Sequence, residues 1–269
     1  MPMDHDRLCD RLVEQTRLLA AHLDGADLTL PVPTCPGWTL RNLVRHLWGG
    51  HRWAEETVRT RASEPLPAGI LRDVEDASAD PSPAGAGDGA AAGAWLVEGA
   101  ERLAATLRAA GPGARVWTPV PGARSGFYAR RFAHESAVHR ADAARALGIG
   151  FTLERASAID AVDEWMELES LPMMLDVQPR KRELRGPGRV LAFEADGTAP
   201  AERPRWVVDL TGDALACGRG TGPAAVTVTG PPAELLLVLM RRRPAEGAGV
   251  AVEGDRALLD FWLERVAWS

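Results

Sequence analysis

The segment from Arg131 to Gly148 reads RFAHESAVHRADAARALG, and its composition predicts a helix on which the organisation of the chain depends. Alanine, the residue with the highest helix propensity, is frequent in it, and neither proline nor glycine occurs before Gly148. Glycine commonly follows the last residue of a helix, because it adopts a left-handed backbone conformation at little cost. We therefore expect this helix to end just before Gly148.

Glu135 and His139 are four residues apart in this segment, which places both side chains on one helix face. A carboxylate and an imidazole in that arrangement can bind the same metal ion, and an open catalytic zinc site has three protein ligands. Asp142, about one turn further on, could accept a hydrogen bond from the second ring nitrogen of a histidine ligand. The same spacing is typical of a solvated face on which Glu135 pairs with a nearby arginine, so both interpretations remain open.

Candidates for a third ligand lie on another predicted helix, which begins after the N-cap residue Thr39 and contains His46 and His51. The two histidines are five residues apart, or about 140° around a helix axis, so a straight helix cannot direct both at one ion. One of them could complete a set with Glu135 and His139, and the spacing does not say which.

The first part of the chain is expected to be mostly helical, with breaks at proline and glycine. Besides the central segment, apolar periodicity predicts helices over residues 4–24, 39–61, 94–110 and 156–170. Residues 63–93 predict a loop with room for a short helix near residues 70–74, and the pair Gly49-Gly50 suggests a close helix approach or a kink. Long helices with such breaks favour an antiparallel bundle whose inward side chains bind ligands.

The pattern changes in the last third of the chain, where short alternating segments predict strands. The expected strands cover residues 189–193, 206–210, 214–218, 225–229 and 249–252, and the expected helices cover residues 233–242 and 255–268. Such a mixture is typical of a small α+β domain. We expect a helical domain at residues 1–178 and an α+β domain at residues 179–269.

Composition excludes several classes of protein. The chain has 269 residues, 46% of them hydrophobic, and its formal net charge of −6 argues against nucleic acid as a partner. It has no apolar run of the about 20 residues that span a membrane, and its charged N-terminus does not resemble a signal peptide. Cys9, Cys35 and Cys217 form no Cys-x2-Cys pair, which fits a reducing cytoplasm, and we expect Cys35 to be a structural residue.

Several stretches of the chain resemble one family. Residues 35–39 (CPGWT) and 43–47 (LVRHL) resemble the N-terminal motif of the mycothiol-dependent maleylpyruvate isomerase family, and Glu135-x3-His139-x2-Asp142 is similar to its second motif. Residues 226–230 (VTVTG), 235–239 (LLLVL) and 252–255 (VEGD) resemble its C-terminal domain. The resemblance implies a DinB-like four-helix bundle that binds a metal, followed by a small α+β domain of the sterol-carrier type.

The resemblance also implies a set of site residues. His46, Glu135 and His139 would be the ligands of a divalent metal, Zn²⁺ being the best match, with His46 preferred over His51. Arg242 falls near an arginine that supports activity in the family, although Arg241 and Arg243 flank it and the register could shift by one. Three cations after a helix are also explained by their favourable interaction with the helix dipole.

The function that the resemblance implies is enzymatic, with mycothiol as a low-molecular-weight thiol cofactor and a small electrophile as substrate. Two neutral imidazoles and one carboxylate leave a divalent ion a residual positive charge, which favours a bound thiolate. In the family's isomerase reaction the thiolate adds to an activated C=C bond, the single bond rotates, and elimination gives the trans isomer. We expect a cis–trans isomerase or an S-transferase, in which Arg242 would bind a substrate carboxylate or stabilise an enolate.

Two other functions remain. A small-molecule-binding protein with a structural metal site and no catalysis would place an apolar ligand in the C-terminal domain, although residues 235–239 are more simply a buried helix. A metal-sensing regulator is disfavoured, because the chain has neither clustered basic residues nor a cysteine-rich motif. An open coordination position would favour catalysis over a structural metal.

Overall fold

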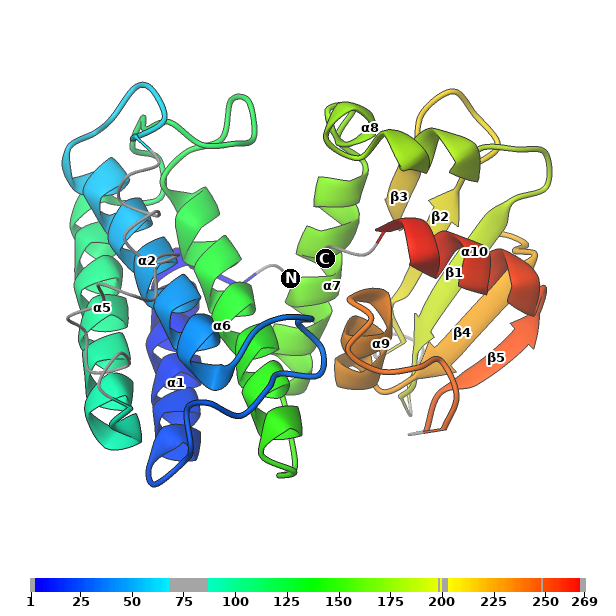
Figure 1. Cartoon of the computed structure of the whole chain (residues 1–269). Helices are drawn as coiled ribbons and strands as arrows, with labels where there is room; N and C mark the ends of the chain where they lie inside the picture. Colours follow the sequence, from blue (N-terminus) through cyan, green and yellow to red (C-terminus); the bar gives the residue numbers. More distant parts are fainter. Residues whose placement is uncertain (1–2, 68–86, 198, 200–202, 248, 267–269) are drawn as a thin grey trace. The chain divides into compact units, whose positions relative to one another are not determined.

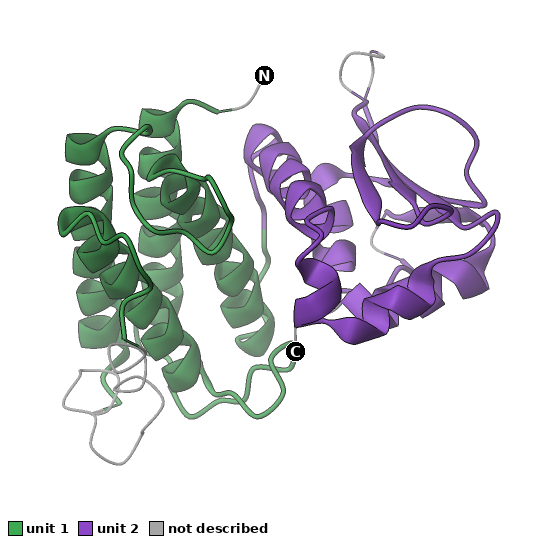
Figure 2. Cartoon of the chain, turned by 90° about the horizontal axis from the view of Figure 1, so that it is seen from above, with its two compact units in different colours: residues 1–151 green, residues 152–269 purple. Residues whose placement is uncertain are grey.

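A computed structural model describes residues 3–67, 87–197, 199, 203–247 and 249–266. It divides the chain into two compact units, Met1–Phe151 and Thr152–Ser269 (Figure 2). The short helix expected near residues 70–74 lies outside the described residues. None of the helices in the described part of the chain is long and apolar enough to span a membrane.

Within the described residues of the first unit, four helices form a bundle (Figure 1): α1 (His5–Leu23), α2 (Leu40–Arg59), α5 (Gly89–Ala110) and α6 (Gly126–Ala146). Helix α1 packs against α5 and α6, and α2 packs against the same two helices. Buried leucines supply much of the core, among them Leu12, Leu19, Leu43, Leu47, Leu96 and Leu103. The predicted helical bundle is confirmed, and the α2–α6 contact brings His46 to the helix that carries Glu135 and His139.

Two helix ends lie where the sequence placed them. The Thr39 side chain accepts a hydrogen bond from the backbone N–H of Asn42, whose side chain accepts one from the backbone N–H of Thr39. This reciprocal capping box satisfies two backbone donors that the first turn of a helix leaves unpaired. The second of these ends is the C-terminus of α6, where Leu147 is the C-cap and Gly148 follows with a φ of 69°.

The second unit contains a mixed sheet, five-stranded in the described residues, with the order β3-β2-β1-β4-β5. Its strands are β1 (Val190–Ala195), β2 (Arg205–Asp209), β3 (Ala216–Arg219), β4 (Val226–Gly230) and β5 (Ala251–Gly254). The β1–β4 pair is parallel, and the other neighbouring pairs are antiparallel. The predicted α+β domain is confirmed, and each observed strand overlaps a predicted one.

Three helices of this unit are α7 (Arg155–Glu169), α9 (Pro232–Leu239) and α10 (Arg256–Val266); between α7 and β1 lie the short α8 (Met174–Val177) and a 3-10 helix, η2 (Pro179–Leu184). Phe193 and Trp206 are paired across β1 and β2, so both side chains point to one face of the sheet. The α10 residue Trp262 packs on Phe193, and Nε1 of Trp206 donates to Asp163 of α7 at 2.7 Å. Helices α7 and α10 therefore cover the same face.

The expected domain boundary after residue 178 differs from the observed division between Phe151 and Thr152. Helix α7 was assigned to the bundle by its sequence, but it packs on the sheet unit. Trp165 of α7 lies edge-on to Trp262, with ring centroids 5.4 Å apart, and Asp163 forms an ion pair with Arg219 of β3. An apolar helix face shows that a helix is buried, but not which distant residues bury it.

Candidate metal centre

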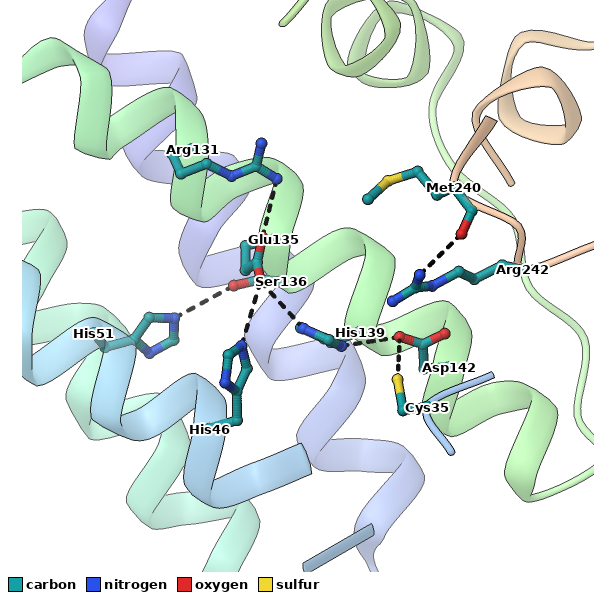
Figure 3. A network of polar contacts seen from close by, with 10 residues as sticks. All are labelled: Cys35, His46, His51, Arg131, Glu135, Ser136, His139, Asp142, Met240 and Arg242. Atoms are coloured by element: carbon teal, nitrogen blue, oxygen red, sulfur yellow. Dashed lines mark hydrogen bonds and ion pairs between the residues drawn. The ribbon is translucent and has the colours of Figure 1, made fainter. Parts of the chain in front are cut away.

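The three residues expected to bind a metal converge between two helices of the bundle (Figure 3). His46 comes from α2, and Glu135 and His139 come from α6. Oε1 of Glu135 lies 3.2 Å from Nε2 of His139 and 3.4 Å from Nε2 of His46. One ligand atom from each residue falls within 4.8 Å of the other two.

This donor set suits a divalent metal ion. Two imidazole nitrogens and one carboxylate oxygen are a ligand set found in catalytic zinc sites, and several other divalent ions also accept it. No fourth His, Cys, Asp or Glu ligand atom joins this group among the residues that the structure describes. The side chain of His139 is 7% exposed and that of His46 is 44% exposed, so the group is open on the His46 side.

The opposite nitrogen of His139 is also engaged. Nδ1 lies 2.9 Å from Oδ2 of Asp142, which is the contact that the spacing allowed for. The indole of Trp38 packs beside both imidazoles, with ring centroids 4.9 Å from His46 and 6.1 Å from His139. The two predicted histidine ligands, His46 and His139, therefore share an aromatic neighbour.

Arg131 forms an ion pair with the second carboxylate oxygen of Glu135, with Nη2 3.0 Å from Oε2. The arginine pairing that stood as an alternative to metal binding thus occurs, but it uses Oε2 and leaves Oε1 to the imidazoles. Burial raises the pKa of Glu135, yet the positive charge of Arg131 and the imidazole hydrogen bonds outweigh it and hold that pKa well below its usual value. The carboxylate is therefore ionised at neutral pH.

The pKa of His139 is shifted in the other direction. Burial lowers it, but hydrogen bonds with Asp142, Cys35 and Glu135 outweigh burial and hold the pKa well above its usual value. Without a metal the imidazole therefore favours its protonated form. A metal ion at Nε2 must displace a proton, so metal binding is coupled to pH.

His51 and His134 belong to no such group of ligand atoms within the described residues. His51 is completely buried, and its Nε2 lies 3.4 Å from Oγ of Ser136. Desolvation lowers the pKa of His51 to about 3, so it is a neutral residue of the bundle core. His134 is also buried and lies one residue before Glu135, about 100° around α6.

Arg242 belongs to the second unit. Helix α9 ends at Leu239, so the three arginines follow its C-terminus, and Nη1 of Arg242 donates to the carbonyl oxygen of Met240 at 2.9 Å. Arg243 is paired with Glu234 at 3.3 Å, and Arg241 has a left-handed backbone with a φ of 56°. A carbonyl contact of this kind is the interaction expected of a cation beyond a helix C-terminus. A role of Arg242 toward substrate stays a prediction.

The structure adds residues that the sequence analysis did not single out. Arg131 could have been found, because it precedes Glu135 by one helical turn, a spacing typical of ion pairs. Thr34 donates to Asp142 from a loop more than a hundred residues away in the chain, and no local pattern indicates that contact.

Comparisons with known proteins identify the family to which the chain belongs. Residues 9–144 match the family model for the mycothiol maleylpyruvate isomerase N-terminal domain, and residues 156–261 match the model for the C-terminal domain of that family. No curated protein matches the chain. Among solved structures, the chain is similar to a mycothiol-dependent maleylpyruvate isomerase, with 14% identity, 93% of each chain covered and a TM-score of 0.59. A histidine-to-alanine mutant of that enzyme matches with 13% identity, the same 93% coverage of each chain and a TM-score of 0.56. Because the two family models together span most of the sequence, the chain belongs to the mycothiol maleylpyruvate isomerase family.

Proposed function

We propose that the protein is a metal-dependent enzyme that uses mycothiol, or a closely related low-molecular-weight thiol, to act on a small electrophilic substrate. The reaction would be a cis–trans isomerisation of the maleylpyruvate type or an S-transfer. The observation that carries the proposal is the convergence of His46, Glu135 and His139 across α2 and α6. Family membership supports the thiol cofactor, because the solved structures that resemble the chain are described as mycothiol-dependent isomerases.

The residues of the site have distinct roles in this proposal. His46, Glu135 and His139 would hold one divalent ion, Zn²⁺ being the best match to the donor set. When bound with an open coordination position, such an ion lowers the pKa of a thiol and supplies a thiolate nucleophile at neutral pH. Arg131 directs Oε1 of Glu135 into the group by holding Oε2.

Arg242 would be the catalytic cation toward the substrate. A guanidinium can bind a carboxylate through two hydrogen bonds or stabilise negative charge that develops on oxygen. A cytoplasmic location accompanies the proposal, supported by Cys9, Cys35 and Cys217, none of which forms a disulfide within the described residues. The proposal assigns no nucleic-acid or membrane partner, in line with the net charge of −6.

The test has two stages. Metal analysis of the purified protein should find about one divalent ion per chain in the wild type and little in His139→Ala. His46→Ala should lose the ion and His51→Ala should retain it; the reverse result would mean that the wrong histidine was chosen.

Turnover is then measured with and without added thiol across small unsaturated acids and other electrophiles. Thiol-dependent turnover in the wild type and none in His139→Ala supports the enzyme. Bound metal without thiol-dependent turnover would favour the other function, a small-molecule-binding protein with a structural metal site.

A further inference from the structure

Asp142 is completely buried, and its carboxylate contacts the side chains of Thr34, Cys35 and His139. Oγ1 of Thr34 donates to Oδ1 at 2.6 Å, and Sγ of Cys35 donates to Oδ2 at 3.5 Å. Nδ1 of His139 lies 2.9 Å from Oδ2. A buried carboxylate is costly unless hydrogen bonds replace its hydration, so this set of contacts accounts for a charge in the interior.

The contact with Asp142 determines which nitrogen of His139 is available. An ionised carboxylate only accepts hydrogen bonds, so Nδ1 carries the proton that it donates to Asp142. In the neutral imidazole Nε2 then has its lone pair free, and that atom faces Oε1 of Glu135 at 3.2 Å. The carboxylate therefore selects the tautomer that a metal at the His46–Glu135–His139 group requires.

Residues of the loop between α1 and α2 donate hydrogen bonds to Asp142. This loop closes on itself, because the backbone N–H of Val32 donates to the carbonyl of Trp38 at 2.8 Å, and that of Trp38 donates to the carbonyl of Cys35 at 3.0 Å. The turn presents Thr34 and Cys35 to Asp142 and, a few residues later, Trp38 to the imidazoles (Figure 3 shows Cys35 beside Asp142). The motif at residues 35–39 thus serves the site without supplying a ligand.

A second metal ion offers another explanation for this cluster, since ligand atoms of Cys35, His139 and Asp142 also fall within 4.8 Å of one another. That ion would need Nδ1 of His139 as a ligand while Nε2 serves the first group, which requires an imidazolate with no proton on either ring nitrogen. Donor-to-acceptor contacts at 2.6 and 2.9 Å account for the same residues without that cost.

We infer that Asp142 is a positioning residue of the metal centre, which fixes the tautomer and ring orientation of His139 and is held in place by Thr34 and Cys35. The inference rests on the proposed function, because it concerns the same metal ligands. Hydrogen-bond partners of metal ligands typically change metal affinity or activity by about 10–100-fold when they are replaced.

The experiment compares zinc affinity, measured by competition with a chromophoric chelator, in the full-length wild type and in Asp142→Asn. We expect affinity to fall by about 10–100-fold in the variant, with an unchanged far-UV circular dichroism spectrum. Thr34→Val, which leaves the carboxylate in place, should give a smaller loss. Glu55→Gln is the matched control, because Glu55 is also buried in the bundle and accepts a hydrogen bond from Thr106 at 3.0 Å, and its affinity should equal that of the wild type.

A second readout is the ¹⁵N chemical shifts of His139 in the zinc-loaded proteins. The wild type should show a protonated Nδ1, and Asp142→Asn should show a weakened or lost Nδ1–H signal. Equal zinc affinity in Asp142→Asn and wild type, or a wild-type His139 protonated on Nε2, would overturn the inference and leave the proposed function standing. No zinc binding by the wild type would refute both.

Discussion

Gly50 of α2 and Phe132 of α6 approach so closely that a β-carbon on Gly50 would lie 2.8 Å from Cε1 of the phenyl ring. The sequence suggested either a close helix approach or a kink at this glycine pair, and α2 runs unbroken from Leu40 to Arg59. The contact lies about one turn after His46 and about one turn before Glu135. It therefore limits the separation of the two helices at the candidate metal centre.

Gly50→Ala should weaken both the fold and the site. Overpacking in a core typically costs about 1–3 kcal/mol, which exceeds the roughly 0.5–1 kcal/mol that alanine gains over glycine in a helix. Urea unfolding and zinc competition would measure the two effects. Gly50→Ala should cost less stability and less zinc affinity when it is introduced into Phe132→Leu than when it is introduced into the wild type. A Gly50→Ala variant as stable as the wild type would contradict the close contact.

Arg131→Met should lower metal affinity by about tenfold, because Glu135 loses the cation that holds Oε2 and can rotate. Arg131→Lys keeps the charge but lacks the planar guanidinium, so its affinity should fall between those of the wild type and Arg131→Met. Isothermal titration with zinc would measure the series. Identical affinities in all three proteins would show that the ion pair does not orient the carboxylate.

His51 should make the folded protein sensitive to acid. Its pKa is about 3 in the folded protein because of burial, and the ordinary value applies in the unfolded chain, so the unfolded state binds more protons at mildly acidic pH. The contribution is fully present above about pH 6.5 and is lost as the pH falls, by about 2 kcal/mol between pH 7 and pH 5.

The measurement is urea unfolding of metal-free protein at several pH values, in the wild type and in His51→Gln. We expect the loss of stability between pH 7 and pH 5 to be smaller in the variant, whatever its stability at pH 7. Removing the metal from both proteins separates this effect from proton competition at the ligands. Parallel curves for the two proteins would contradict a neutral, buried His51.

Lys181, the only lysine of the chain, is fully buried and donates to Oε1 and Oε2 of Glu169 at 2.8 and 2.6 Å. Lys181→Met should destabilise the second unit by about 3–5 kcal/mol, because the carboxylate loses its buried cation. The double variant with Glu169→Met should recover much of that loss, since no charge stays buried at the pair. Thermal unfolding would measure both, and equal losses in the single and double variants would argue against the ion pair as the cause.

Arg242→Ala should reduce thiol-dependent turnover by about 10²–10³-fold, the usual effect of removing one group that stabilises developing charge. Metal content should not change, because the three proposed ligands lie in the first unit. Arg241→Ala and Arg243→Ala are the matched controls. A loss confined to one of these neighbours would shift the assignment by one residue, and full activity in all three variants would exclude a catalytic arginine here.

Several features of the fold and of the candidate site depend only on residues that are close together in the sequence. The Thr39 cap, the helix end before Gly148 and the shared face of Glu135 and His139 depend on residues within one or two turns, so backbone geometry alone was sufficient to predict them. The strands of the second unit were predicted for the same reason, because apolar and polar residues alternate along a strand when one of its faces is buried.

Other features required the tertiary structure, because they join residues that are far apart in the chain. Helical spacing showed that His46 and His51 point in different directions, but only the α2–α6 packing puts His46 near Glu135 and His51 beside Ser136. The unit to which α7 belongs depends on Trp206 and Trp262, and the environment of Asp142 depends on a loop that precedes it by 107 residues or more. Periodicity gives the direction of a side chain about the axis of its own helix or strand, whereas the partner of that side chain depends on how whole elements pack.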